Sequence, residues 1–327
     1  MRGLVGQFPK QLEEALVIGA EANLKEYIND IDNVLITGLG GSGIGGKIVS
    51  QLIANECPIP ITINNTYDIP AFVNEKTLVI ASSFSGNTEE TLYALQEAFK
   101  RNAEIAVITS GGEILKIAQE KGLNHIILPT GKSPRAMLSY SLTQQFYLLH
   151  HYGLIGGEFV AEIEQTINLL NSEADNIEAL AGEVAKKIEN KTPIIYSSDR
   201  YEGVAIRLRQ QLNENAKVLC WHHALPEMNH NELVGWAGGN NEFAVICFRN
   251  DDDFLRTQVR MDITRDVISK ITDSYIELSS KGETRIEKSL YLIFLGDWIS
   301  VILSELKGVD PIEVEIIAHL KGELAKI

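Results

Sequence analysis

Two segments in the N-terminal third of the chain contain the residue types that bind a phosphate group. Val34 to Gly46 (VLITGLGGSGIGG) is an apolar run followed by glycines and a serine, and Thr77 to Thr91 (TLVIASSFSGNTEET) is an apolar run followed by hydroxyl side chains. Each pattern predicts a strand, a turn and then a helix. Backbone N–H groups at such a turn, together with the positive end of the helix dipole, favour an anion. Because hydroxyl donors add to these N–H groups, a compact phosphomonoester is the anion that fits best.

The first segment also matches the dinucleotide-binding pattern Gly-x-Gly-x-x-Gly at residues 38–43. That pattern requires an acidic residue about 20 positions later, at the end of the second strand. The second strand is predicted at Ile59 to Ile63, but it leads into Asn64, and Asp68 lies beyond it in a loop. No Gly-Lys-Ser/Thr sequence completes a Walker loop. Two alternatives without a ligand stay open, a turn that only packs a strand on a helix and an ordinary N-capped helix.

Composition limits the possible partners of the protein. The 327 residues are enough for two domains with a large core, and 45% of them are hydrophobic. The net charge of -15, from 29 basic and 44 acidic residues without a Lys/Arg block, argues against nucleic acid or an anionic membrane as a partner. The three widely spaced cysteines fit a reducing cytoplasm, and neither CxxC nor HExxH spacing indicates a metal site. The N-terminus lacks an apolar signal core, and the apolar stretch Leu290 to Leu303 is predicted to be a buried helix because a membrane span needs ~20 residues.

Strands and helices alternate along the first half of the chain, which predicts a doubly wound parallel sheet. Apolar residues at helical spacing predict an opening helix at 8–29, and a second helix is predicted at Lys47 to Ala54, after the glycines. Glu158 to Lys187 is predicted to be a helix that links two domains, residues 1–155 and 156–327. The predicted strands of the first half begin at Val34, Ile59, Thr77, Glu104 and His125.

The second half repeats this architecture without the phosphate-binding turns. Strands are predicted at Ile194 to Ser197, Phe243 to Phe248 and Ser274 to Leu278, with a helix at Val204 to Asn215. This half must therefore contribute a different chemistry. Its densest group of polar and aromatic residues is Arg207 to Trp236, RLRQQLNENAKVLCWHHALPEMNHNELVGW.

These motifs together resemble a known family. GGSG followed by SFSGNTEET is similar to the sugar isomerase (SIS) domain, which binds phosphorylated sugars through serines and threonines. Nearly the whole chain resembles the bifunctional phosphoglucose/phosphomannose isomerases, through GLGGSG, SFSGNTEET, Pro134-Arg135, LNEN, PEMNHNE and DPIEVEIIAHLK. The resemblance implies an α/β fold of two doubly wound, flavodoxin-like SIS domains with the active site between them. It also implies a cofactor-free isomerase that interconverts glucose 6-phosphate, and mannose 6-phosphate, with fructose 6-phosphate through an enediolate.

The resemblance further implies a role for individual residues. A base must move a proton between C1 and C2, and the family match is Glu214. An acid that titrates near neutrality must open the sugar ring, and the match is His230. Arg135 would stabilise the enediolate, and Lys321 would assist proton transfer at the sugar oxygens. The residues expected to hold the phosphate are Gly40, Gly41, Ser42, Ser83, Ser85 and Thr88.

Several alternatives remain open at this point. Glu214 taken alone fits an exposed glutamate at a helix end, a loop histidine is more often structural, and His222 and His223 lie close to His230 in sequence. In related isomerases the ring-opening histidine comes from the neighbouring subunit, which implies a homodimer. A non-catalytic sugar-phosphate sensor and a SIS isomerase of another sugar phosphate are the competing functions. Ile312 stands where a small polar residue is expected in many relatives, so activity on mannose 6-phosphate is less certain than activity on glucose 6-phosphate.

Overall fold

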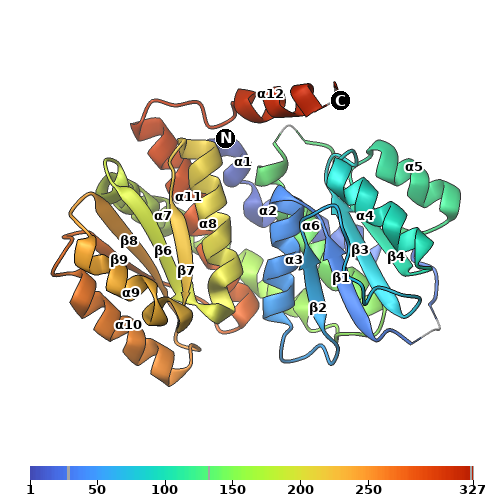
Figure 1. Cartoon of the computed structure of the whole chain (residues 1–327), viewed down its shortest axis with the longest axis horizontal. Coiled ribbons are helices and arrows are strands. Elements are labelled where there is room, and N and C mark those ends of the chain that lie inside the picture. Colours follow the sequence, from blue (N-terminus) through green and yellow to red (C-terminus); the bar gives the residue numbers. More distant parts are fainter. Residues whose placement is uncertain (28–29, 132, 325, 327) are drawn as a thin grey trace. The chain divides into compact units, whose positions relative to one another are not determined.

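The protein forms two compact units, seen here in a computed structural model that describes residues 1–27, 30–131, 133–324 and 326. The first-sheet unit comprises Gly6–Ser172 and Lys281–Tyr291. The second-sheet unit comprises Met1–Val5, Glu173–Ser280 and Leu292–Ile327. Two long helices, α7 (Phe159–Ile188) and α11 (Arg285–Leu306), contribute residues to both units (Figure 1).

The first-sheet unit contains five parallel strands in the order β2-β1-β3-β4-β5, which confirms the predicted parallel sheet (Figure 1). Every residue of β3 is buried, as expected for a central strand covered on both faces. The strand order changes direction between β1 and β3, and open α/β sheets bind ligands at such a switch point. The strands are β1 (Asn33–Thr37), β2 (Ile61–Asn64), β3 (Thr77–Ser83), β4 (Glu104–Thr109) and β5 (Asn124–Ile127).

Helices cover both faces of this first sheet. Alternate strand residues, such as Leu35, Val79 and Val107, form a buried cluster with apolar residues of α4 and α5. The opposite face is covered by α3, which packs on Ile36 through Gly46 and on α6 through Gly45. The helices of this unit are α2 (Phe8–Ala20), α3 (Gly40–Leu52), α4 (Glu89–Lys100), α5 (Gly112–Lys121), the 3-10 helix η1 (Pro134–Ala136) and α6 (Leu138–His151).

The helix predicted at 8–29 is wrong in its second half, because α2 ends at Ala20. Lys25 beyond it exchanges hydrogen bonds with Asn124: its N–H donates to Oδ1 at 2.7 Å, and its carbonyl accepts from Nδ2 at 3.1 Å. This pairing with a residue 99 positions away holds the segment in a non-helical conformation, so tertiary contacts override local propensity. Residues 28 and 29 of the predicted helix lie outside the described residues.

The helix predicted at Lys47 begins much earlier, at Gly40. Glycine has a low helix propensity, so the run Gly40 to Gly46 looks like a turn in the sequence. The glycines are required by close packing instead: a Cβ on Gly46 would lie 2.7 Å from Ile36 Cγ2, and one on Gly43 would overlap the Gly38 carbonyl. The glycine segment is therefore the first turns of a helix pressed onto the sheet.

The second-sheet unit contains four parallel strands in the order β7-β6-β8-β9, the same order with one strand fewer (Figure 1). The strands are β6 (Thr192–Ser198), β7 (Trp221–Leu225), β8 (Phe243–Arg249) and β9 (Tyr275–Ser279). Strand β7 lies within the dense polar segment and was not predicted. The helices are α1 (Arg2–Val5), η2 (Asp199–Tyr201), α8 (Glu202–Ala216), η3 (Glu227–His230), α9 (Glu232–Gly235), η4 (Trp236–Gly238), α10 (Leu255–Ile268) and α12 (Glu315–Leu324).

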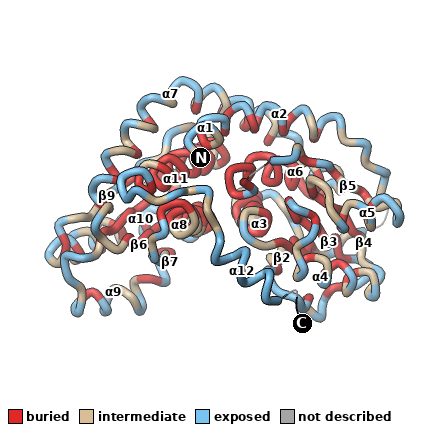
Figure 2. Tube along the Cα trace, turned by 90° about the horizontal axis from the view of Figure 1, so that it is seen from above, coloured by how far each residue is buried: buried red, intermediate tan, exposed pale blue. Residues whose placement is uncertain are grey.

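Helix α11 is the one helix among the described residues whose length and composition would allow it to cross a membrane. In its most apolar stretch 89% of the residues are buried within the protein, and its trace in Figure 2 is largely in the colour of buried residues. Burial of this extent is what the core helix of a globular protein shows. The prediction of a buried helix at Leu290 to Leu303 is confirmed.

Candidate active site

The two glycine- and serine-bearing segments meet at the switch point of the first sheet. The Ser42 hydroxyl, in the first turn of α3, accepts a hydrogen bond of 3.2 Å from the backbone N–H of Phe84, which directly follows β3. Ser83 Oγ lies 2.9 Å from Thr88 Oγ1 and also accepts from the N–H of Gly86 at 3.2 Å. The hydroxyls predicted to bind phosphate therefore belong to one connected pair of turns at one edge of the sheet.

The helices behind these turns begin without a side-chain cap. Leu39 occupies the N-cap position of α3 and has no hydroxyl, and the hydroxyl of Thr88 at the N-cap of α4 pairs with Ser83 and accepts no N–H of its own helix. Uncapped first-turn N–H groups and the helix dipole both attract an anion. The N-capped-helix alternative for Thr88 is thus not what the structure shows. Ser85 is exposed beside these groups and accepts from the N–H of Asn87 at 3.3 Å.

Arg135 lies in the same unit, next to the start of α3. It is in η1 and 7% exposed. A Cβ on Gly41 would stand 3.6 Å from the Pro134 carbonyl oxygen and 3.8 Å from Arg135 Cα, so the backbones of η1 and of the glycine turn are in close contact. The structure therefore places the backbone of Arg135 beside the first turn of α3.

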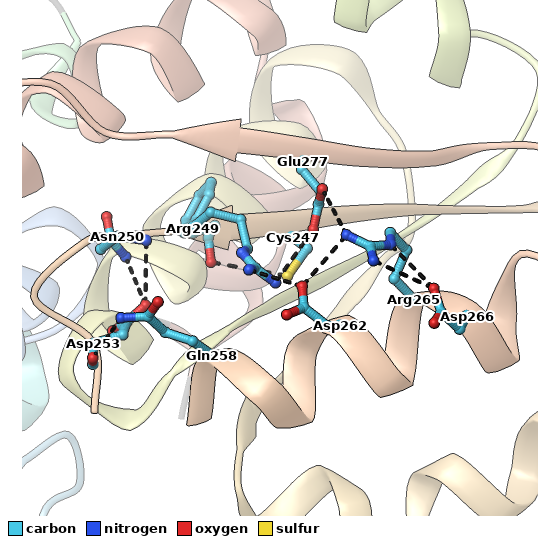
Figure 3. Close-up of polar contacts among 10 residues, drawn as sticks. Cys247, Arg249, Asn250, Asp253, Gln258, Asp262, Arg265, Asp266 and Glu277 are labelled. Atoms are coloured by element: carbon cyan, nitrogen blue, oxygen red, sulfur yellow. Dashed lines mark hydrogen bonds and ion pairs between the residues drawn. The ribbon is translucent and has the colours of Figure 1, made fainter. Parts of the chain in front are cut away.

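The corresponding edge of the second sheet is occupied by side chains of the chain itself. After β8, the carboxylate of Asp253 accepts from the Ser198 hydroxyl at the end of β6. It also accepts from the N–H of Asn250 at 3.2 Å (Figure 3). Burial raises the pKa of Asp253, although these hydrogen bonds oppose the rise. The neighbouring Asp252 accepts from Tyr201 at 2.6 Å. Two carboxylates thus lie beside the carboxyl ends of β6 and β8, in the half of the chain that has no phosphate-binding turn.

Glu214 is half-buried near the end of α8. Lys217 caps that helix end in a left-handed conformation (φ 55°) and donates from Nζ to the Glu214 carbonyl and to the Glu313 carbonyl, both at 2.7 Å. Glu313 immediately precedes α12, the helix that carries Lys321. Lys217 therefore ties the end of α8 that carries Glu214 to the C-terminal segment. Lys321 itself is exposed, and α12 has no buried residue among those described (Figure 2).

The three histidines of the dense segment have different surroundings. His222 faces α8 and is half-buried, and burial lowers its pKa, with Arg209 adding to the effect. His223 lies on the other face of β7, and its Nδ1 is 2.8 Å from Glu232 Oε2. His230 ends η3 and is exposed. Of the three, His230 is the imidazole that is most accessible to a substrate.

Two protein families match the two halves of the chain. The SIS domain family matches residues 27–155, and the family described as "Bacterial phospho-glucose isomerase C-terminal SIS domain" matches residues 177–324. The chain is 38% identical over 334 aligned residues to the bifunctional phosphoglucose/phosphomannose isomerase of Caldicellulosiruptor bescii, covering 99% of this chain and 98% of that one. The chain belongs to the bifunctional phosphoglucose/phosphomannose isomerase family.

Another relative of this chain is named for a different activity. The D-glucosamine-6-phosphate 4-epimerase of Sulfolobus acidocaldarius is 31% identical over 68% of this chain and 71% of its own length. Among solved structures, the C-terminal domain of glucosamine-fructose-6-phosphate aminotransferase from Francisella tularensis superposes with a TM-score of 0.75 at 15% identity, over 94% of this chain and 96% of that one. That likeness shows a shared fold, two parallel-sheet SIS domains.

The structure shows contacts of two further residues, Lys217 and Glu232, that the sequence did not predict. Nothing in the spacing of Lys217 distinguishes a C-cap lysine from a solvated one. Glu232 is an ordinary member of the PEMNHNE motif in the sequence, yet three side-chain donors surround its carboxylate. Its position two residues after His230 was the one available signal.

Proposed function

We propose that this protein is an isomerase of hexose 6-phosphates that interconverts glucose 6-phosphate, and mannose 6-phosphate, with fructose 6-phosphate. The observation that carries the proposal is the connected pair of turns at the first switch point, in which Ser42 contacts the backbone after β3 and two helices begin uncapped. Membership of the isomerase family supports the reaction class. The protein would need no cofactor, since the chemistry is proton transfer.

The phosphate would be held by donors of the first-sheet unit. Gly40 and Gly41 let the backbone approach the anion, and Gly40 has a positive φ of 54° that favours glycine. The hydroxyls around them supply further donors, and hydrogen bonds to a charged group contribute about 1.5–3 kcal/mol each. The proposed phosphate ligands are Gly40, Gly41, Ser42, Ser83, Ser85 and Thr88.

The proton transfers would be carried out by four further side chains. Glu214 would take the proton from C2 and return it to C1, and a half-buried carboxylate suits that role. His230 would protonate the ring oxygen as the C1–O5 bond opens. Arg135 would stabilise the negative charge on the enediolate oxygens, and Lys321 would exchange protons with the sugar hydroxyls.

We further propose that the protein acts as a homodimer in the cytoplasm. The exposed position of His230 supports its use by a neighbouring subunit, and the three free cysteines, Cys57, Cys220 and Cys247, support a reducing compartment. The net charge of -15, without a Lys/Arg block, argues against nucleic acid or an anionic membrane as a partner.

Purified protein, without added metal, is incubated with fructose 6-phosphate or with mannose 6-phosphate, and glucose 6-phosphate is followed in a coupled assay. The mannose arm includes a separate phosphoglucose isomerase, with and without this protein, to convert any fructose 6-phosphate formed. Turnover in both arms supports the bifunctional isomerase. Turnover of fructose 6-phosphate alone would restrict the specificity and point to Ile312. Binding of a sugar phosphate without turnover would favour the sensor.

Ser85→Ala is expected to raise KM for fructose 6-phosphate about tenfold with little change in kcat, because a uniform phosphate contact is lost. Ser85 is exposed and its hydroxyl accepts only one local N–H bond among the described contacts, so the turn should keep its shape. Ser172→Ala, an exposed serine on α7, is the matched control and should leave both constants unchanged. An unchanged KM in the Ser85 variant would remove this serine from the phosphate site.

Mixed dimers test whether His230 acts across a subunit interface. Glu214→Gln and His230→Ala proteins should each be inactive, but after mixing and exchange of subunits one site in each hybrid dimer would hold both intact residues. About a quarter of wild-type activity is then expected, since about half of the dimers are hybrids with one working site each. Activity that does not return, although hybrids are demonstrated by native mass spectrometry, would place His230 in the site of its own subunit.

A further inference from the structure

Glu232 lies two residues after His230, at the start of α9, and its carboxylate is the centre of a hydrogen-bond network. Oε1 accepts from the Tyr196 hydroxyl at 2.5 Å and from Trp221 Nε1 at 3.0 Å, and Oε2 lies 2.8 Å from His223 Nδ1. The carboxylate side chain is 23% exposed. A single side chain next to His230 thus engages three partners.

These three partners belong to two neighbouring strands. Tyr196 of β6 is the register partner of His223 in β7, and Trp221 is the register partner of Ile194, so the three side chains share one face of the sheet. Tyr196 is fully buried, and burial together with the hydrogen bond to Glu232 raises the pKa of its hydroxyl, which keeps it a donor at neutral pH. The carboxylate therefore fastens its segment to the rigid centre of the unit.

Other residues on both sides of His230 are also held by contacts with the core of this unit. Trp236, buried four residues after Glu232, donates from Nε1 to the Tyr196 hydroxyl at 2.9 Å. On the other side of His230, Met228 is fully buried and Asn229 donates to Thr264 on α10 at 2.9 Å. The anchored residues flank an exposed imidazole. A catalytic side chain on a loop is held accurately only when the neighbouring residues are locked in this way.

We infer that Glu232 is a positioning residue for His230, whose contacts with β6 and β7 fix where the imidazole is presented for ring opening. This inference rests on the proposed isomerase function and adds a residue to it. Ring opening transfers a proton to O5 as the C1–O5 bond breaks and the O1 hydroxyl loses its proton. Because that transfer depends on hydrogen-bond geometry, a displacement of about 1 Å can cost about 100-fold in rate.

Ring opening and isomerisation can be measured separately. Exchange NMR of glucose 6-phosphate follows the interconversion of its anomers, which requires ring opening but not isomerisation. Glu232→Ala is expected to lower both anomer exchange and isomerisation about 10- to 100-fold, by the same factor. Glu214→Gln, by contrast, should lose isomerisation and keep anomer exchange. Glu232→Gln retains an acceptor oxygen for Tyr196 and Trp221, so it should recover to within a few-fold of wild type. Glu183→Gln, an exposed glutamate of α7, is the matched control.

A second readout does not depend on activity. Hydrogen exchange at the backbone amides of residues 227–236 should be faster in Glu232→Ala and unchanged in Glu232→Gln. If Glu232→Ala does not fold, Trp221→Phe removes one donor and keeps an aromatic ring, with a smaller loss in both rates expected. Unchanged hydrogen exchange in residues 227–236, or a loss of isomerisation with normal anomer exchange, would overturn the inference. Absence of both reactions in the wild-type protein would refute the proposed function, while the exchange data would still decide whether Glu232 holds the segment.

Discussion

Glu214→Gln is expected to lower kcat for fructose 6-phosphate by about 10²- to 10⁴-fold, the range that a general base contributes. The amide has the shape of the carboxylate but cannot accept the C1 proton of fructose 6-phosphate that must move to C2. Because the contacts proposed for the phosphate are in the first-sheet unit, KM should change little. Lys217 donates to the backbone carbonyl of Glu214, a contact that the substitution keeps, so the helix end should stay intact in the variant. Steady-state kinetics with both sugar phosphates measure this effect.

The matched control is Glu202→Gln, the same substitution in the first turn of the same helix. This variant tests whether removal of any negative charge from α8 lowers the rate. Its kcat should stay within a few-fold of the wild-type value. A complementary measurement follows exchange of the C2 hydrogen of glucose 6-phosphate with deuterated water, which should stop in the Glu214 variant. Turnover within a few-fold of wild type in Glu214→Gln would assign the base to another residue and leave the isomerase proposal itself in place.

Arg207→Met is expected to destabilise the second-sheet unit by about 3–5 kcal/mol, the cost of leaving a buried charge without its partner. Arg207 on α8 donates to Asp297 on α11 from Nε at 3.2 Å and from Nη2 at 2.8 Å, with side chains 2% and 4% exposed. The helices approach closely there, since a Cβ on Gly296 would lie 3.2 Å from Leu208 Cδ1. Methionine fills much of the volume, so the loss comes from charge and not from a cavity.

Burial raises the pKa of Asp297, and Arg207 opposes that rise. A carboxyl whose folded pKa is raised contributes its stability below its unfolded pKa and loses it as pH increases. The difference between wild type and Arg207→Met should therefore be smaller at pH 4 than at pH 8. The three tryptophans, Trp221, Trp236 and Trp298, all lie in the second-sheet unit, so urea unfolding followed by their fluorescence reports on this unit.

Two further variants make the test of this ion pair specific. The double variant Arg207→Met with Asp297→Leu should recover most of the lost stability, because an apolar pair of similar volume can replace a buried ion pair. Arg265→Met removes an exposed cation, 37% exposed in its ion pairs, and should cost at most about 1 kcal/mol. Equal losses of unfolding free energy in Arg207→Met and Arg265→Met would show that the buried ion pair stabilises the protein no more than an exposed one.

The alternation of apolar strands and helices was sufficient to predict two doubly wound parallel sheets. Prediction failed where a contact distant in sequence decides the local structure. Asn124 holds Lys25 out of the opening helix, and the close approach to Ile36 requires the glycines that hide the start of α3. Strand β7 begins with Trp221 and contains two histidines, so its sequence has neither a strand-like apolar run nor a regular alternation.

The candidate site was predictable to a different degree in each unit. The anion site follows from the local rule that a strand, a turn and a helix N-terminus attract an anion, and the structure joins its two turns. The roles of Glu214, His230, Arg135 and Lys321 came from resemblance alone, and they remain proposals. Glu232 could not be assigned from sequence, because its importance depends on Tyr196, 36 positions away.

The division of the chain between the units has a consequence for biosynthesis. When the ribosome has released Ser172, every strand of the first sheet exists, but residues Lys281–Tyr291 of that unit do not. They arrive roughly 110 residues later, about 5–20 s at usual elongation rates. Thr284 and Ile286 line a cavity of about 170 Å³ with Phe146 and Phe159. The nascent first-sheet unit therefore lacks this segment until the second sheet has been made, and the residues that the segment contacts, Phe146 and Phe159 among them, stay without that cover during synthesis.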